Sequence, residues 1–134
     1  YTQLNPITKQ LCMGFGVACN ICEPKYPQGT ILCFNDMNNP SLNNATIYAN
    51  GVRDPVGFDF NPINNQMWFT DHNRDNMGIN YHNFPDCELN KVTHIGEHFG
   101  FPYCHSTGFG DPELRYPNQS NLIIDPDYGY KVNG

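Results

Sequence analysis

The sequence predicts an all-β fold, and three observations lead to that prediction. Charged residues make up only 15% of the chain, which carries 12 glycines and 11 prolines, so it is rich in turns and poor in helix-forming residues. Short apolar runs of strand length alternate with turns built from Asn, Gly and Pro. A strand pattern also recurs along the chain, and no segment has the period of a helix.

The strand pattern is clearest in the middle of the chain. Val56, Phe58 and Phe60 alternate with smaller or polar residues, which predicts a half-buried strand with these three side chains facing the core. A turn rich in Asn and Pro leads to the aromatic run 67–70, the second strand of the predicted hairpin. Polar clusters flank this hairpin, where loops of β scaffolds often carry functional residues.

Two segments repeat with nearly the same spacing. NPITKQLCMGFG begins at Asn5, and NPINNQMWFTDH begins at Asn61, 56 residues later, while Leu32 corresponds to Leu89 with a shift of 57. Repeated antiparallel units predict the blades of a β-propeller. We expect residues 1–50 and 51–110 to form successive units of about 56 residues, followed by a connecting tail over 111–134.

The predicted units are too few for a closed ring. Two blades fall short of the roughly four to eight of a propeller, so the chain is expected to be a fragment. The missing blades would come from the same polypeptide or from a larger assembly. The chain starts at Tyr1 without Met or an apolar leader, which is typical of a processed or partial sequence. The alternative is a compact domain of two sheets.

Charge and cysteine content narrow the partners and the compartment. A net charge of −6 argues against nucleic acid, and no run of about 18 apolar residues predicts a membrane span. Six cysteines and two glycosylation sequons, at Asn44 and Asn118, predict a secreted glycoprotein.

The cysteines suggest a disulfide framework. Cys12 and Cys33 fall on strands joined by one long loop, Cys19 and Cys22 would close that loop, and Cys87 would then pair with Cys104. This is one of 15 possible pairings. The alternative is a zinc site built from the first four cysteines, although the second C-x-x-C of such a site is missing.

Two further features are candidates for a site. Asp71-x-Asn73-x-Asp75 resembles the opening of an EF-hand loop, but Asn76 and His82 stand where that loop needs Gly and Glu. The alternative is an Asx-rich turn that satisfies its own backbone. Arg53 suits a carboxylate ligand because its guanidinium can bind both oxygens, and its alternative is a buried structural pair with Asp54 or Asp59.

The motifs GVRDPVGFDFNP, MWFTDHNRD, PDCELNKV and GEHFGFPYCH, in this order, resemble the glucose/sorbosone dehydrogenase family. The upstream GFGVACNICEP and GTILCFN are similar to its sorbosone-dehydrogenase branch. The resemblance spans roughly residues 11–111. It implies a six-bladed propeller that uses pyrroloquinoline quinone (PQQ) and calcium to oxidise sugars.

The resemblance also implies roles for single residues. Arg53 and Asp54 would contact PQQ, and the backbone carbonyls of Asn73 and Arg74 would bind its calcium. Asp54 replaces an Asn of the family, and Asn73 stands where Gly is common. The family's general-base His is expected outside this chain.

Two functions follow from the sequence. One is a part of a secreted PQQ- and calcium-dependent sugar or aldose dehydrogenase. The other is a catalytically inactive extracellular propeller for adhesion, carbohydrate binding or assembly, which Asp54 and the extra cysteines favour.

Overall fold

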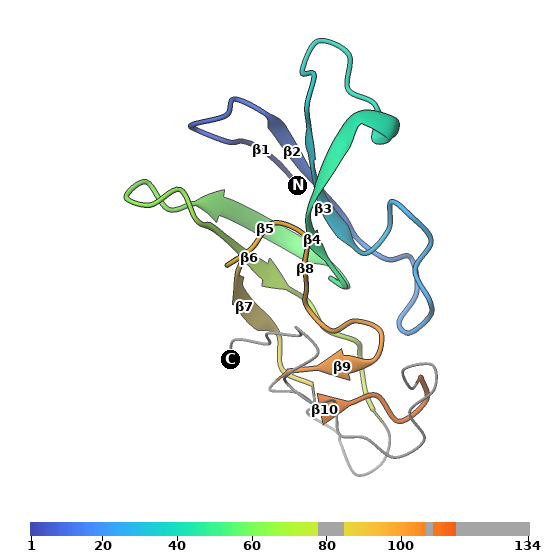
Figure 1. The fold of residues 1–134 in the computed structure, drawn as a ribbon. Coiled ribbons are helices and arrows are strands. Elements are labelled where there is room, and N and C mark those ends of the chain that lie inside the picture. The colour runs from blue at the N-terminus through green and yellow to red at the C-terminus, as the bar shows by residue number, and fades with distance from the viewer. Residues whose placement is uncertain (78–84, 107–108, 115–134) are drawn as a thin grey trace.

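The computed structural model describes residues 1–77, 85–106 and 109–114, and these form an all-β fold, as predicted (Figure 1). The described residues contain no α-helix and one 3-10 turn, η1, Leu42–Asn44. The strands are β1 (Thr2–Leu4), β2 (Leu11–Phe15), β3 (Thr30–Phe34), β4 (Ala45–Asn50), β5 (Pro55–Phe60), β6 (Met67–Asp71), β7 (Glu88–Lys91), β8 (Glu97–His98), β9 (Cys104–His105) and β10 (Phe109–Gly110).

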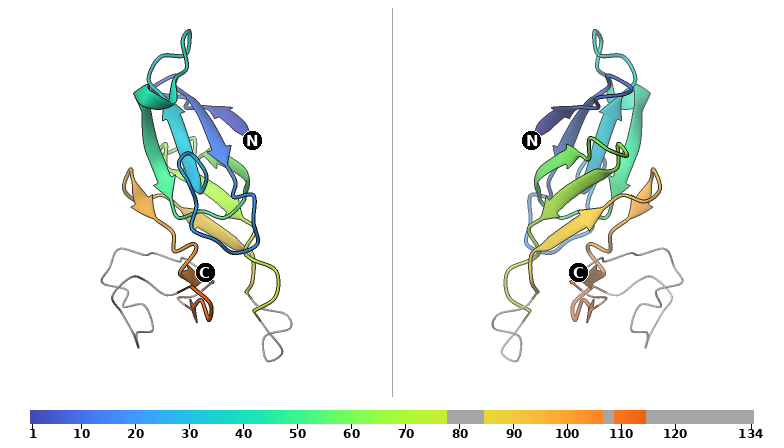
Figure 2. Two further views of the ribbon diagram at one scale, coloured as in Figure 1. Left: turned by 90° about the vertical axis from the view of Figure 1, so that its right-hand side faces the viewer. Right: turned by 90° about the vertical axis from the view of Figure 1, so that its left-hand side faces the viewer.

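The strands form two main sheets and a small hairpin. The first sheet has the order β1-β2-β3-β4-β8, in which β1 to β4 are an antiparallel meander and β8 runs parallel to β4. The second is the antiparallel meander β5-β6-β7, and β9 pairs with β10. The views of Figure 2 show the two main sheets packed together, and in the described residues they do not close into a ring.

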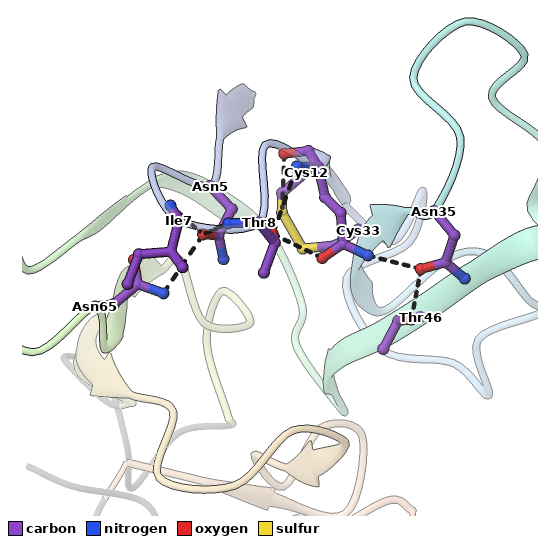
Figure 3. Close-up of a disulfide and its surroundings, with 9 residues drawn as sticks. Asn5, Ile7, Thr8, Cys12, Cys33, Asn35, Thr46 and Asn65 are labelled. Carbon is purple, nitrogen blue, oxygen red and sulfur yellow. Dashed lines mark hydrogen bonds between the residues drawn. A yellow bond between two sulfur atoms is a disulfide. The ribbon is translucent and has the colours of Figure 1, made fainter.

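The repeated turns of the sequence have the same geometry. The Lys9 amide donates to the Asn5 carbonyl at 2.9 Å, and the Asn65 amide donates to the Asn61 carbonyl at 2.7 Å. Lys9 and Asn65 both have positive φ, 59° and 57°. The two turns also touch, because the Asn65 side-chain amide donates to Asn5 Oδ1 at 3.4 Å (Figure 3). The division into units 1–50 and 51–110 stays a prediction.

The core lies between the two main sheets. It contains Ile31 and Ala49 from the first sheet and Phe58 and Phe69 from the second. Phe99, which follows β8, packs edge-on against Phe69 with ring centroids 4.8 Å apart. Burial of these apolar side chains holds the sheets together.

One side chain of the predicted core faces solvent. Phe58 and Phe60 are buried as expected, but Val56 is 62% exposed. The register of β5 shifts between Pro55 and Gly57, which leaves Val56 as the extra residue of a β-bulge. The bulge interrupts the alternation of sides, so the prediction for Val56 was wrong.

Two of the three expected disulfides are present, Cys12–Cys33 and Cys19–Cys22. Cys12 and Cys33 are direct partners in the β2–β3 ladder (Figure 3). The expected Cys87–Cys104 pair is not formed. Both cysteines are free thiols, Cys87 exposed just before β7 and Cys104 buried on β9.

The remaining predictions on localisation concern the surface. Asn44 is exposed at the end of η1, where a glycan could be attached, and Asn118 lies outside the described residues. None of the helices in the described residues has the length and apolar character to cross a membrane.

Candidate functional site

The predicted site residues meet at one end of the second sheet. Pro55 at the start of β5 is paired with Asp71 at the end of β6, so the segments outside these strands are neighbours. The sequence predicted Arg53 and Asp54 as one cluster and Asn73 and Arg74 as another. The structure brings the two clusters together.

Asp71 joins the two segments. Its carboxylate accepts hydrogen bonds from the Arg53 amide at 3.0 Å and from the Asp54 amide at 2.8 Å. The His72 amide in turn donates to the Asp54 carbonyl at 3.0 Å. Asp71 is 2% exposed, and burial raises its pKa to about 7, with a further contribution from the charge of Glu88.

Arg53 is the centre of the site. Its NH1 donates to the carbonyls of Asn73 at 2.8 Å and His72 at 3.0 Å. Nε donates to the Asn20 carbonyl and NH2 to Asn20 Oδ1, both at 3.2 Å. The residue is 8% exposed, and its nearest carboxylate, of Asp75, lies 4.0 Å from NH2. The guanidinium is therefore fixed mainly by neutral oxygens.

Asp54 has its carboxylate at the exposed side of this site. Its bonds to Asp71 and His72 are made by its backbone amide and carbonyl. Gly16 approaches it closely, since a Cβ on Gly16 would lie 2.9 Å from Asp54 Oδ1. In the described residues Arg53 forms no ion pair with Asp54 or Asp59, so the alternative of a buried pair with one of them is not seen, and its contact with a carboxylate is the long one with exposed Asp75.

Asn73 is buried, and its side chain does not form an EF-hand-like ligand set. Its amide nitrogen donates to the Asp86 carbonyl at 2.8 Å and to Glu88 Oε1 at 2.7 Å. Its Oδ1 lies 3.3 Å from Nδ1 of His105. Asp71 binds the backbone amides of Arg53 and Asp54, so two of the three EF-like positions have internal partners. These partners lie outside the turn, so the contacts are not those of an Asx-rich turn that satisfies its own backbone.

Arg74 directs its side chain away from Arg53 into a second polar network. It forms ion pairs with Asp111 at 2.6 Å and Glu113 at 2.7 Å. His105 Nε2 lies 2.7 Å from the same oxygen of Asp111. Burial alone would raise the pKa of Asp111, but the hydrogen bonds from His105 and Arg74, together with backbone amides, hold it well below its usual range.

This second network is a structural support rather than an open site. His105 and Asp111 are 0% and 2% exposed. Both ring nitrogens of His105 face internal oxygens, on Asn73 and Asp111. Glu88, whose pKa is raised by burial, accepts from Asn73 and from Asn90. The network fixes the loop that carries the Asn73 carbonyl.

Sequence reasoning missed several members of these networks: Asn20, Glu88, His105 and Asp111. Asn20 had one usable signal, its position inside C-x-x-C. Glu88 follows Cys87 in a motif that was noted only for its resemblance. His105 and Asp111 have no local pattern, because their contacts join residues that are distant in sequence.

Side chains alone do not make a metal centre in the described part of the chain. No group of three or more His, Cys, Asp or Glu residues there could hold an ion. The zinc alternative is wrong, because all four of its cysteines are in disulfides. Calcium binding by the Asn73 and Arg74 carbonyls stays a prediction.

No family model matches the chain. A protein of Borreliella burgdorferi (strain ATCC 35210 / DSM 4680 / CIP 102532 / B31), named only as uncharacterised, is 36% identical over 116 residues. That match covers 87% of this chain and 28% of the relative, so the chain spans little more than a quarter of it.

Two solved structures share the fold. Both are Carbohydrate-Active Enzymes Family AA12 proteins of Trichoderma reesei. The calcium structure has a TM-score of 0.73 and 19% identity, over 97% of this chain and 40% of that one. The iodide structure has a TM-score of 0.69 and 23% identity, over 84% of this chain and 33% of that one.

These findings correct the family suggested by the sequence. Membership of the glucose/sorbosone dehydrogenase family is wrong, because no family model matches and the similar solved structures belong to AA12. Short motifs around turns and strand ends follow from the shared β scaffold as well as from common function. The chain has the fold of a part of the Trichoderma reesei AA12 proteins.

Proposed function

We propose that this chain is part of a secreted, sugar-oxidising β-propeller protein that binds PQQ and calcium at the Arg53 end of the second sheet. The other blades would come from the remainder of the polypeptide or from a partner in a larger assembly. This proposal includes the successive units 1–50 and 51–110 with their connecting tail.

One observation carries the proposal: Arg53 lies against the Asn73 carbonyl, 2.8 Å away, although 20 residues separate them. A fixed cation and a row of loop carbonyls at one end of a sheet suit a ligand that has carboxylates and brings its own metal ion. The likeness to carbohydrate-active enzymes, one of them a calcium structure, supports the sugar substrate and the metal.

The residues present fit calcium only together with an anionic ligand. The Asn73 carbonyl has two lone pairs, and Arg53 uses one of them. Calcium alone would stand beside a guanidinium in a buried setting, where repulsion between like charges is weakly screened. PQQ is a planar tricarboxylate, so its negative charge would offset that repulsion when it is bound.

The chain's own residues would then bind and orient. When bound, PQQ would supply the redox chemistry, with calcium as the Lewis acid. Arg53 would hold a carboxylate, Asp71 would keep the segment of Arg53 in register, and the Asn73 carbonyl would face the metal. His105 is buried and bonded on both sides, which makes it unsuitable as a base, so the general base is expected outside this chain.

The test is dye reduction by the full-length protein with aldoses, PQQ and calcium. Arg53→Lys keeps the positive charge but loses the planar guanidinium that can bind both oxygens of a carboxylate, and it should reduce turnover at least tenfold. Lys91→Arg is the matched control, because it also exchanges one basic side chain for another. Lys91 on β7 lies over the ring of Trp68 on β6, with Nζ 5.7 Å from the ring centroid. Absence of aldose oxidation and of PQQ binding in the wild-type protein would refute the proposal.

A second candidate is the non-catalytic extracellular propeller, and the bonding of Arg53 favours it. Internal oxygens already accept from Nε, NH1 and NH2 of this side chain. Under this candidate Arg53 is a structural residue, and a folded Arg53→Lys variant binds carbohydrate or partner proteins as the wild type does. Measured binding of glycans by both proteins, with no response to PQQ, would support it.

A further inference from the structure

We propose that Asn20, inside the ring closed by the Cys19–Cys22 disulfide, is the residue that positions the Arg53 guanidinium. This inference rests on the proposed function, in which Arg53 binds a carboxylate of the ligand. It adds a positioning residue and a dependence on the redox state of the Cys19–Cys22 ring.

Asn20 uses both its backbone and its side chain on two partners. Its carbonyl accepts from Arg53 Nε and its Oδ1 from Arg53 NH2, both at 3.2 Å. The same Oδ1 accepts from the Asp75 amide at 2.6 Å, and Nδ2 donates to the Asp75 carbonyl at 2.7 Å. One side chain therefore fixes the guanidinium and the loop after β6 together.

These contacts set the orientation of the guanidinium. Asn20 holds the edge formed by Nε and NH2, while the carbonyls of His72 and Asn73 hold NH1. A planar group with hydrogen bonds on two edges cannot rotate about its last bond. NH2 has two N–H groups, and Asn20 accepts from one of them. Asp75 lies 4.0 Å from NH2, beyond hydrogen-bond length, so the other N–H is a donor that remains for a carboxylate.

The position of Asn20 needs support, because it lies in a strandless loop between β2 and β3 and is itself exposed. Two features supply that support. The Val17 amide donates to the Arg53 carbonyl at 2.7 Å, so the start of the loop is bonded to the segment that contains Arg53. The Cys19–Cys22 disulfide then limits the conformations of the residues between them. Reduction of this disulfide should free Asn20 and, with it, Arg53.

The test compares Asn20→Ala with Asn20→Asp in the full-length protein. Ala removes all three side-chain hydrogen bonds, whereas Asp keeps the oxygen that accepts from Arg53 and from the Asp75 amide and loses only the donor to the Asp75 carbonyl. The control is Asn38→Ala, because Asn38 is exposed in another loop. Its backbone amide donates to the side chain of nearby Asp36, and Ala keeps that amide. The first readout needs no ligand: the rate at which phenylglyoxal modifies Arg53, followed by peptide mass spectrometry.

We expect modification of Arg53 to be at least tenfold faster in Asn20→Ala and after reduction of the disulfide. Asn20→Asp and Asn38→Ala should stay within threefold of the wild type, and the melting temperature of Asn20→Ala should change little. An unchanged rate in Asn20→Ala would overturn the inference.

The second readout separates this inference from the proposed function. PQQ affinity should fall about tenfold in Asn20→Ala and be restored in Asn20→Asp. If Arg53→Lys weakens PQQ binding and Asn20→Ala does not, the positioning role is wrong and the proposed function stands. If no protein binds PQQ while Asn20→Ala still exposes Arg53, the proposed function is wrong and Asn20 positions Arg53 for another purpose.

Discussion

Replacement of Arg53 by Met should loosen the site strongly. Met retains an apolar stem but leaves the carbonyls of Asn20, His72 and Asn73 without their donor. Hydrogen bonds from a charged donor contribute about 1.5–3 kcal/mol each, and their sum is reduced because the buried cation no longer has to be desolvated. The residue is only 8% exposed, so solvent screening removes little of this loss. We expect a net local destabilisation of about 3 kcal/mol.

Hydrogen exchange of peptides covering 50–75, followed by mass spectrometry, measures this loss. A loss of about 3 kcal/mol accelerates exchange through local opening by roughly 100-fold. Lys91→Met removes the same charge from the half-buried contact with Trp68 and should change exchange by less than about fivefold, since such a cation–π contact contributes about 0.5–1 kcal/mol. Exchange within threefold of the wild type in Arg53→Met would refute the reasoning that Arg53 holds these loops.

Three further predictions follow from buried groups. Gly51→Ala should destabilise the protein by about 3 kcal/mol in thermal unfolding, because its Cβ would lie 2.1 Å from the His98 ring at φ +64°. Burial lowers the pKa of His98 to about 4, so the stability that its neutral form provides is present above about pH 6.5 and is lost as the pH falls through 4. Unfolding midpoints from pH 7 to pH 4 should therefore fall less in His98→Asn than in the wild type, and equal slopes would contradict this. Burial raises the pKa of the Cys104 thiol to about 11. Iodoacetamide at pH 8 should therefore alkylate exposed Cys87 at least tenfold faster than Cys104, and equal rates for the two cysteines would contradict this prediction.

The all-β fold was predictable because period-2 patterns and turn residues are local signals. The repeated turns at Asn5 and Asn61 share an Asn that accepts from the amides that follow it, and this chemistry is visible in sequence. The prediction that Val56 faces the core was wrong, also for a physical reason. A β-bulge depends on how two strands register, and the sequence of one strand does not reveal it.

The site was predictable only in part. Residues at strand ends were found because turns and strands mark them, and the pairing of Pro55 with Asp71 brings them together. Asn20 and His105 were not found, since their roles come from contacts across the fold: Asn20 reaches residues 33 and 55 positions away. The predicted Cys87–Cys104 disulfide is not formed, and that prediction rested on the assumption that all six cysteines are in disulfides.

The most direct test of the central claim is calorimetric titration of the full-length protein with calcium alone, with PQQ alone and with both. We predict weak binding of calcium alone, because the Arg53 guanidinium on the Asn73 carbonyl repels the ion, and at least tenfold tighter binding of PQQ when calcium is present. Arg53→Met should abolish that gain. Tight calcium binding without PQQ that Arg53→Met leaves unchanged, or no PQQ binding under any condition, would contradict the account.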